Sequence, residues 1–360
     1  MTVLSRGPER TRVARLGPAT ALWRPRTVVV CALLLLALAV ALLVALSVSV
    51  NFVPPARVIA TVFGHGTPAE RLIVGELRMP RALVGAVVGL ALGLSGALFQ
   101  SVTRNPLGSP DVIGFDTGAA TGALVAMLFA GGGVVPTSVS AVLGGVCTAV
   151  LVLLLAQRGR SVAPLRLVLV GIGIGATLAA VNSMLIVGAQ VYDAQSAAVW
   201  LVGNLAGRGW DRLVVLGPVV AVALVLALLV GRSLAVAEFA DDRAASLGVA
   251  PDRVRLLAVG IGVLLASAAV ATAGPIAFIA LAAPQVARRL TRATGPNLLA
   301  SGLTGAVFLV LTDWAAREAF QPRQLPVGVL TGVVGGLYLI WLLGREWGAS
   351  RPGAARGGRL

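Results

Sequence analysis

The sequence predicts an all-α polytopic membrane protein with ten transmembrane helices. Two observations predict this fold class. Of the 360 residues, 58% are hydrophobic and only 12% are charged, which is roughly half the charged fraction of soluble domains. Apolar runs close to the length that crosses a bilayer recur along the whole chain. Helices are the spanning structure that such runs can form, because they satisfy their own backbone groups in lipid.

The apolar runs define the predicted elements in order. The ten runs cover residues 28–50, 82–99, 117–131, 135–156, 167–187, 213–230, 256–273, 276–290, 298–312 and 327–343. The third and eighth runs are short, so their ends are the least defined. The chain thus divides into an arginine-rich tail over residues 1–27, a ten-helix membrane domain over residues 28–343 and a second tail over residues 344–360.

The distribution of arginine predicts the orientation in the membrane. All 29 basic residues are arginine, and most of them fall on the inner segments if the N-terminus lies inside. Cytoplasmic loops carry such an excess of positive charge. The ten runs then place both termini in the cytoplasm. The net charge of +15 is therefore a membrane-topology signal and not a nucleic-acid footprint.

Composition excludes several classes of function. The chain has one histidine and two cysteines, Cys31 and Cys147, which lie in apolar runs. No His/Cys metal cluster and no cofactor site is predicted. A P-loop needs a lysine, and the chain has none. No ionisable residue lies deep in any run as drawn, which argues against an ion-coupled carrier and an intramembrane enzyme. This absence does not exclude a passive channel as the class of function.

Three arginines are predicted on the outer side. Arg78 and Arg81 stand three residues apart at the start of the second run, where Pro80 suits a helix start. Arg317 follows the ninth run. These side chains either extend to the membrane interface or form a docking surface for an acidic partner.

The inner loop over residues 233–255 predicts a short helix between residues 237 and 247. Gly248 is placed to end it, and Pro251 is expected to stop any continuation. This segment is either a solvated loop or a coupling element that docks into another subunit.

A broken polar stretch, SVTRNPLGSPDVIG over residues 101–114, follows the second run. Pro106 and Pro110 forbid a continuous helix, and Asn105 is biased away from helix by the following proline. The stretch predicts a rigid turn at the cytoplasmic mouth. Ahead of it, Gly85 and Gly93 belong to a four-residue glycine repeat, which is typical of close helix packing.

The motifs carry a family resemblance. The segment over residues 78–118, RMPRALVGAVVGLALGLSGALFQSVTRNPLGSPDVIGFDTG, resembles the permease subunits of ABC importers for ferric siderophores, haem and cobalamin, the FecCD type. Three later blocks agree in order: ASLGV over 245–249, GPIAFIALAAPQVAR over 274–288 and LPVGVLTG over 325–332. The resemblance implies a bacterial plasma-membrane permease, not an enzyme. It also implies a second permease subunit, identical or sister, two cytoplasmic ATPase subunits and an extracytoplasmic substrate-binding lipoprotein.

The resemblance also implies roles for particular residues. Arg78, Arg81 and Arg317 are expected to dock the binding protein. The cytoplasmic gate is expected at Asn105, Pro106 and Leu107. The ATPase-coupling residues are expected to be Ala245, Ser246, Leu247, Gly248 and Val249. A second gate at Pro164 and Leu165 is carried over weakly, because the turn before it lacks the small hydroxyl residues expected there.

The predicted function is the permease of an ATP-driven importer for a ferric siderophore. Gln285 stands where the family commonly has histidine, which favours a siderophore over cobalamin. Cobalamin or haem transport is the alternative within the family, and a stand-alone secondary carrier or channel is the alternative of a different class.

Overall fold

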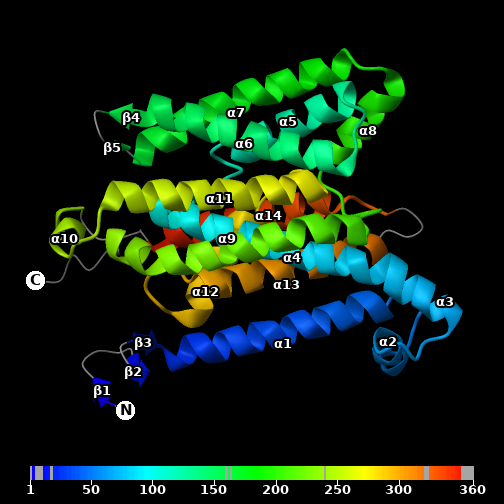
Figure 1. Cartoon of the computed structure of the whole chain (residues 1–360), viewed down its shortest axis with the longest axis horizontal. Coiled ribbons are helices and arrows are strands. Elements are labelled where there is room, and N and C mark those ends of the chain that lie inside the picture. The colour runs from blue at the N-terminus through cyan, green and yellow to red at the C-terminus, as the bar shows by residue number, and fades with distance from the viewer. Residues whose placement is uncertain are drawn as a thin grey trace, which may run out of the picture.

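A computed structural model describes the chain except residues 1, 5–10, 17–18, 159–160, 163, 239–240, 320–323 and 350–360. Long helices run side by side along the longest axis of the molecule (Figure 1). In that view α10 and the start of α1 lie at the left end, whereas α2, α3 and α8 lie at the right end. The bundle therefore has two distinct ends, and they present different segments.

Each predicted apolar run corresponds to a helix. The long helices are α1 (Pro25–Ser47), α4 (Met79–Thr103), α6 (Val134–Ala156), α7 (Pro164–Val187), α9 (Trp210–Ala237), α11 (Pro251–Ala273) and α13 (Leu298–Glu318). Within the described residues these supply 7 helices that are long and apolar enough to cross a membrane. The other three apolar helices are α5 (Phe115–Phe129), α12 (Ile279–Thr291) and α14 (Val327–Ala349). The helical membrane fold is confirmed, whereas the number of ten membrane crossings stays a prediction.

Shorter elements connect or precede these helices. They are α2 (Pro55–Val62), α3 (Pro68–Glu70), the π-helical η1 (Arg71–Arg78), α8 (Val191–Leu201) and α10 (Asp241–Ser246). Strands β1 (Thr2–Leu4), β2 (Thr11–Leu16) and β3 (Ala19–Trp23) pair antiparallel in that order, and β4 (Gln157–Arg158) pairs with β5 (Ser161–Val162). Of these, only the short helix after α9 was predicted from the sequence.

Helix α4 forms the centre of the bundle and is buried along nearly its whole length. The predicted glycine repeat explains how it packs. A Cβ atom at Gly89 would collide with the carbonyl of Gly305, and one at Gly93 would collide with the carbonyl of Ser301. Helices α4 and α13 thus approach at backbone distance, which only small residues allow.

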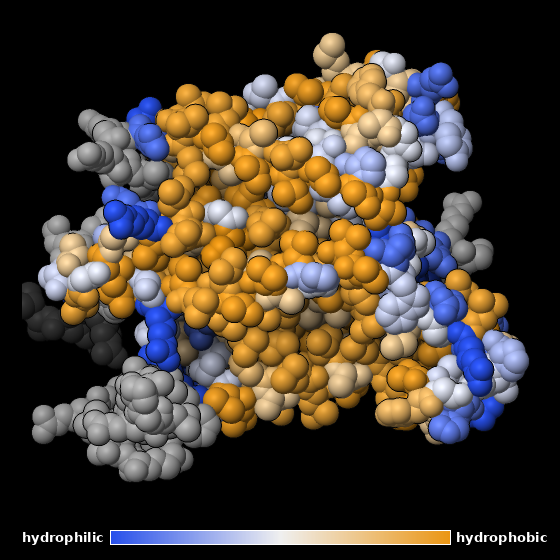
Figure 2. Space-filling view, in the orientation of Figure 1, coloured by the Kyte–Doolittle hydropathy of each residue, from blue (hydrophilic) through white to orange (hydrophobic). Residues whose placement is uncertain are grey.

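The lateral surface of the bundle is apolar. Figure 2 shows an orange band across the middle of the molecule, with blue residues gathered toward its two ends. Exposed leucines and valines on the outer helices, such as Leu36, Leu143 and Leu229, contribute to this surface. A soluble monomer rarely exposes so large a continuous apolar area. The band is therefore the surface that lipid or another membrane subunit covers.

Candidate functional site

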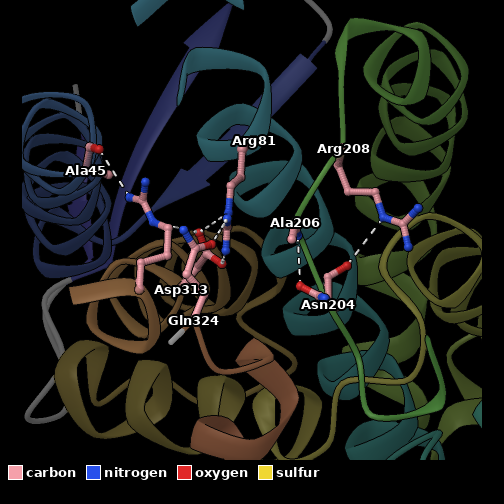
Figure 3. A network of polar contacts seen from close by, with 8 residues as sticks. Ala45, Arg81, Asn204, Ala206, Arg208, Asp313 and Gln324 are labelled. Carbon is pink, nitrogen blue, oxygen red and sulfur yellow. Dashed lines mark hydrogen bonds and ion pairs between the residues drawn. The ribbon is translucent and has the colours of Figure 1, made fainter. Parts of the chain in front are cut away.

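Two of the three outer arginines, Arg81 and Arg317, meet at one aspartate. Arg81 forms a bidentate ion pair with Asp313, with its Nε at 2.9 Å from Oδ2 and its Nη2 at 2.8 Å from Oδ1. Its Nη1 donates to Oε1 of Gln324 at 3.2 Å (Figure 3). Arg317, one turn after Asp313 on α13, places its Nε 3.6 Å from Oδ2. The Arg81–Asp313 ion pair therefore joins the start of α4 to the end of α13.

Arg78 and Arg317 also hold the end of α1. Arg78 donates to the carbonyls of Leu46 at 2.6 Å and Asn51 at 2.7 Å, and Arg317 donates to the carbonyl of Ala45 at 3.2 Å. The arginines are only 8% to 9% exposed. The structure thus brings together the three residues that the sequence grouped, in buried internal contacts. Docking of a binding protein stays a prediction.

A fourth arginine at this end was not singled out from the sequence. Arg208 lines a cavity of about 420 Å³ together with Asn204 and Ser196, and its Nε donates to the carbonyl of Asn204 at 3.3 Å. Figure 3 shows the Arg208 guanidinium pointing away from the Arg81–Asp313 pair. Burial lowers the pKa of Arg208 to about 10, so the group stays charged at neutral pH. Its only sequence signal was its place in a predicted outer loop.

The predicted turn at residues 105–107 is present and exposed. Helix α4 ends where Arg104 adopts a left-handed conformation, with φ at 51°. Oδ1 of Asn105 then accepts a hydrogen bond from the backbone N–H of Leu107 at 2.9 Å. Gln285, on α12, donates to the carbonyl of Pro106 at 2.9 Å. Asn105 therefore fixes the turn from within, and Gln285 ties it to the bundle.

The predicted coupling segment lies at the same end as this turn. Arg104 donates to the carbonyl of Ala237, the last residue of α9, at 2.8 Å, and α10 follows directly. The N–H groups of Gly248 and Val249 donate to the carbonyls of Ala245 and Ala244, both at 3.0 Å. This is the Schellman helix ending. The pattern fixes the direction in which α10 presents the residues that follow it.

The bounds of the short helix correct the sequence-based expectation, whereas its ending agrees with it. Gly248 has a φ of +78°, as a residue that ends a helix should. The described helix is shorter than predicted, because α9 runs on to Ala237 and α10 begins only at Asp241. The helix does not continue past Gly248, and Pro251 begins a separate helix, α11, where its missing N–H is not needed. Leu247 is 72% exposed.

The weakly predicted second gate lies at the start of α7. Pro164 is the first residue of that helix, and Leu165 is exposed. Residues 159, 160 and 163 of the preceding turn lie outside the described residues. This gate stays a prediction.

A deep polar cavity lies between α5 and α7. It has a volume of about 340 Å³ and is lined by Asp111, Asp116 and Asn182, with walls from Leu201 and Ile276. Gly114, just before α5, lies against Gly171 and Gly175 on α7. Since Gly175 is near the middle of α7, the cavity lies well inside the bundle.

This cavity overturns the expectation that no ionisable residue lies deep among the membrane helices. The predicted third run began at Thr117, but α5 begins at Phe115 and includes Asp116 in its first turn. Asp116 is only 3% exposed. Among the described residues, no group of three or more His, Cys, Asp or Glu that could hold a metal ion occurs.

Comparison with known proteins identifies the family. The model of the FecCD transport family matches residues 35–345. The chain belongs to the FecCD transport family. The ferric enterobactin transport system permease protein FepG of Escherichia coli (strain K12) is 42% identical over 321 residues, covering 89% of this chain and 97% of that protein. The iron(3+)-hydroxamate import system permease protein FhuG of Bacillus subtilis (strain 168) is 32% identical over 327 residues, covering 88% and 97%.

A solved structure agrees with this assignment. The structure of an ABC transporter of the metal-chelate type, in an inward-facing conformation, superposes on this chain with a TM-score of 0.79. The two are 25% identical in sequence, and the match covers 88% of this chain and 99% of the transporter chain. The resemblance stated from the motifs is therefore confirmed. As a FecCD family member the chain is a transport permease and not an enzyme.

Proposed function

We propose that this chain is the membrane-spanning permease of an ATP-driven importer for a ferric siderophore. The observation that carries the proposal is its 42% identity, across 89% of the chain, to a permease named for ferric enterobactin. A second relative is named for iron(3+)-hydroxamate and another for Fe(3+) dicitrate. These names favour a ferric siderophore over haem or cobalamin.

Energy would come from ATPase subunits on the cytoplasmic side, since this lysine-free chain has no standard P-loop. Segment 245–249 is the proposed contact. The Schellman ending of α10 holds Leu247 outward, with little protein around it. An exposed leucine at a rigid helix end offers apolar area that a groove on another subunit would gain by burying.

The turn at residues 105–107 would close the cytoplasmic end of the path against a second permease subunit. Leu107 is 38% exposed, and the turn is fixed by Asn105 and Gln285. A rigid turn with an exposed apolar side chain suits a seal between two copies better than a mobile loop would. The partner could be identical or a sister chain, and both fit this geometry.

The arginines at the other end would dock an acidic binding protein through their combined charge. Their N–H groups are largely occupied by internal acceptors, but the three guanidinium groups outnumber the two carboxylates near them, Asp313 and Glu318, and leave the cluster positive. Rim charges act mainly on association rate and on salt dependence. Arg317→Gln should therefore slow capture of the binding protein at low salt while keeping the Arg81–Asp313 pair. Unchanged capture would contradict docking.

The proposed orientation places both termini and α10 inside. After replacement of Cys31 and Cys147 by serine, Ser196→Cys on α8 should react with an impermeant thiol reagent from outside. Ser246→Cys on α10 should react only from inside. Both side chains are exposed. Outside labelling of Ser246→Cys would overturn the orientation.

Transport itself is tested in proteoliposomes that contain the permease, its ATPase and its binding protein. Uptake of a ferric siderophore should require all three proteins and ATP. The buried Asp116 would also suit a stand-alone carrier, so the decisive control omits the ATPase. Uptake that persists without ATPase and ATP would contradict the proposal and favour that carrier.

A further inference from the structure

The deep cavity holds hydrogen-bond acceptors that have no partner. Neither carboxylate oxygen of Asp116 accepts a hydrogen bond from a described residue, and the same holds for Oδ1 of Asp111. The other oxygen of Asp111 accepts the backbone N–H of Phe278 at 3.3 Å. Buried acceptors are almost always satisfied in folded proteins. Three unpartnered carboxylate oxygens, on two residues that line one cavity, therefore need donors of hydrogen bonds, which water or a ligand in the cavity would supply.

A second and independent observation points the same way. Asn182 enters the cavity from α7, a different helix, and is only 5% exposed. Its Oδ1 also has no partner among the described residues. Acceptors from two helices therefore converge on the same space.

The two carboxyl groups of the cavity have no cationic partner among the described residues. No arginine or histidine of the described part of the chain lines the cavity, and the sequence contains no lysine. Asp116 lies in the first turn of α5, but a helix N-terminus supplies only about half a unit of positive charge. Two carboxylates need more than that, because burying an unpaired charge is strongly unfavourable.

The walls and size define the chemical class of the ligand. Apolar side chains, including Leu201, Val202 and Ile276, surround the acceptors. A volume of about 340 Å³ is at the lower end for ligand sites, so it suits a side group rather than a complete chelate. An inorganic cation would prefer more oxygen ligands and fewer apolar walls. An alkylammonium group can donate hydrogen bonds to the unpartnered acceptors, while its carbon atoms contact the apolar walls.

We infer that this cavity binds the positively charged amine of a ferric chelate on its way through the permease. The inference rests on the proposed function and names the substrate class: chelates that carry a free amine are favoured over the same chelates without one. Its mouth includes the exposed residues Ala179 and Ser183 on α7, so a group arriving along that face enters the cavity that Asp116 lines.

The first experiment tests the charge preference without a binding protein. In the background lacking Cys31 and Cys147, Ser183→Cys is treated with a cationic trimethylammonium methanethiosulfonate and with its anionic sulfonate counterpart. Val191→Cys, exposed on α8 and outside the cavity lining, is the matched control. The cation-to-anion rate ratio should be about tenfold higher at position 183, the size expected for one charge in partly desolvated surroundings. Asp116→Asn should bring the ratio down to that of the control.

The second experiment measures uptake of two chelates that differ in one charge. Ferrioxamine B carries a free amine, and its N-acetylated form does not. The uptake ratio of the two should favour the amine in the original protein and fall toward one in Asp116→Asn. Equal reagent ratios at positions 183 and 191, no reaction at position 183, or ratios unchanged by Asp116→Asn would overturn the inference. Failure to import any ferric chelate would refute the proposed function instead, while the reagent ratios would still decide the charge preference.

Discussion

At the scale of single residues, Asp313 holds the cluster of outer arginines together. It accepts both hydrogen bonds of the Arg81 fork and lies 3.6 Å from Arg317. The pair is buried, so removing one member leaves the charge of the other without compensation. Breaking such a pair costs about 3–5 kcal/mol.

Asp313→Asn should therefore lower the free energy of unfolding of the detergent-purified permease by roughly 3 kcal/mol, measured by thermal or denaturant unfolding. Asp211→Asn is the matched control, because its contact with Arg212 is 3.9 Å long and the carboxylate is exposed. Exposed pairs contribute about 0–1 kcal/mol. A small, equal effect of the two substitutions would mean that Asp313 does not stabilise the cluster.

The position of Asp116 inside a membrane helix could not be predicted from the sequence. It stands directly before an apolar run, and hydropathy alone cannot decide whether such a residue belongs to the helix or to the loop. The close packing of Gly114 against α7 moves the start of α5 into the bundle. That contact joins segments about sixty residues apart in the sequence, and no local pattern announces it.

At the scale of elements, the glycines of α4 set how closely two helices pack. The sequence predicted close packing from the four-residue spacing but could not name the partner, because spacing defines a face and not what lies against it. The structure places α13 there, with the Ser301 carbonyl opposite Gly93.

Gly93→Ala should force α4 and α13 apart and reduce the yield of folded permease, with a loss of about 1–3 kcal/mol typical of overpacking. Gly336→Ala on α14 is the control, since a Cβ there meets nothing within 4 Å. Folded yield and melting temperature in detergent measure the difference. Equal tolerance of both alanines would contradict the close approach.

The end of α10 permits a second prediction at this scale. Gly248 has a φ of +78°, and a Cβ there would meet no neighbouring atom, so a substitution acts through backbone strain alone. Valine should be disfavoured by about 1–2 kcal/mol in this conformation, shifting the direction in which Leu247 points. Gly248→Val should weaken co-purification of the ATPase or uncouple its hydrolysis from transport.

Asparagine tolerates the left-handed conformation better than other residues with a side chain. Gly248→Asn should therefore retain most of the coupling. Binding-protein capture, at the opposite end of the bundle, should be normal in both variants. Equal loss of coupling with valine and asparagine would show that the side chain, rather than the turn, matters.

At the scale of the whole molecule, the sequence predicted the membrane class and all the apolar helices, because hydropathy reports directly on burial in lipid. The short elements α2, α3 and α8 were missed, since each is built from polar or mixed residues between the runs. Partner surfaces were predicted only through the family motifs. Their physical form, such as the fixed turn at residues 105–107, depends on contacts with distant residues like Gln285.

The turn at residues 105–107 leads to a prediction about the assembled transporter. If two copies of Leu107 seal the cytoplasmic end of the path, Leu107→Ala should leave a gap in the resting state. ATPase-bound proteoliposomes without ATP should then leak small solutes. Gln285→Ala is a useful companion, since it frees the Pro106 carbonyl from its donor and should loosen the turn while keeping Leu107. A smaller leak is expected from Gln285→Ala than from Leu107→Ala.

Crosslinking of Leu107→Cys separates a seal from a plain structural turn. A seal brings the two copies together across the permease dimer in at least one nucleotide state, so a short bifunctional thiol reagent should join them once Cys31 and Cys147 are replaced. Ser246→Cys on exposed α10 tests whether the reagent joins any exposed thiol. A turn that only reverses the chain would give neither leak nor crosslink at position 107, because Leu107 would then be one partly exposed contact among many.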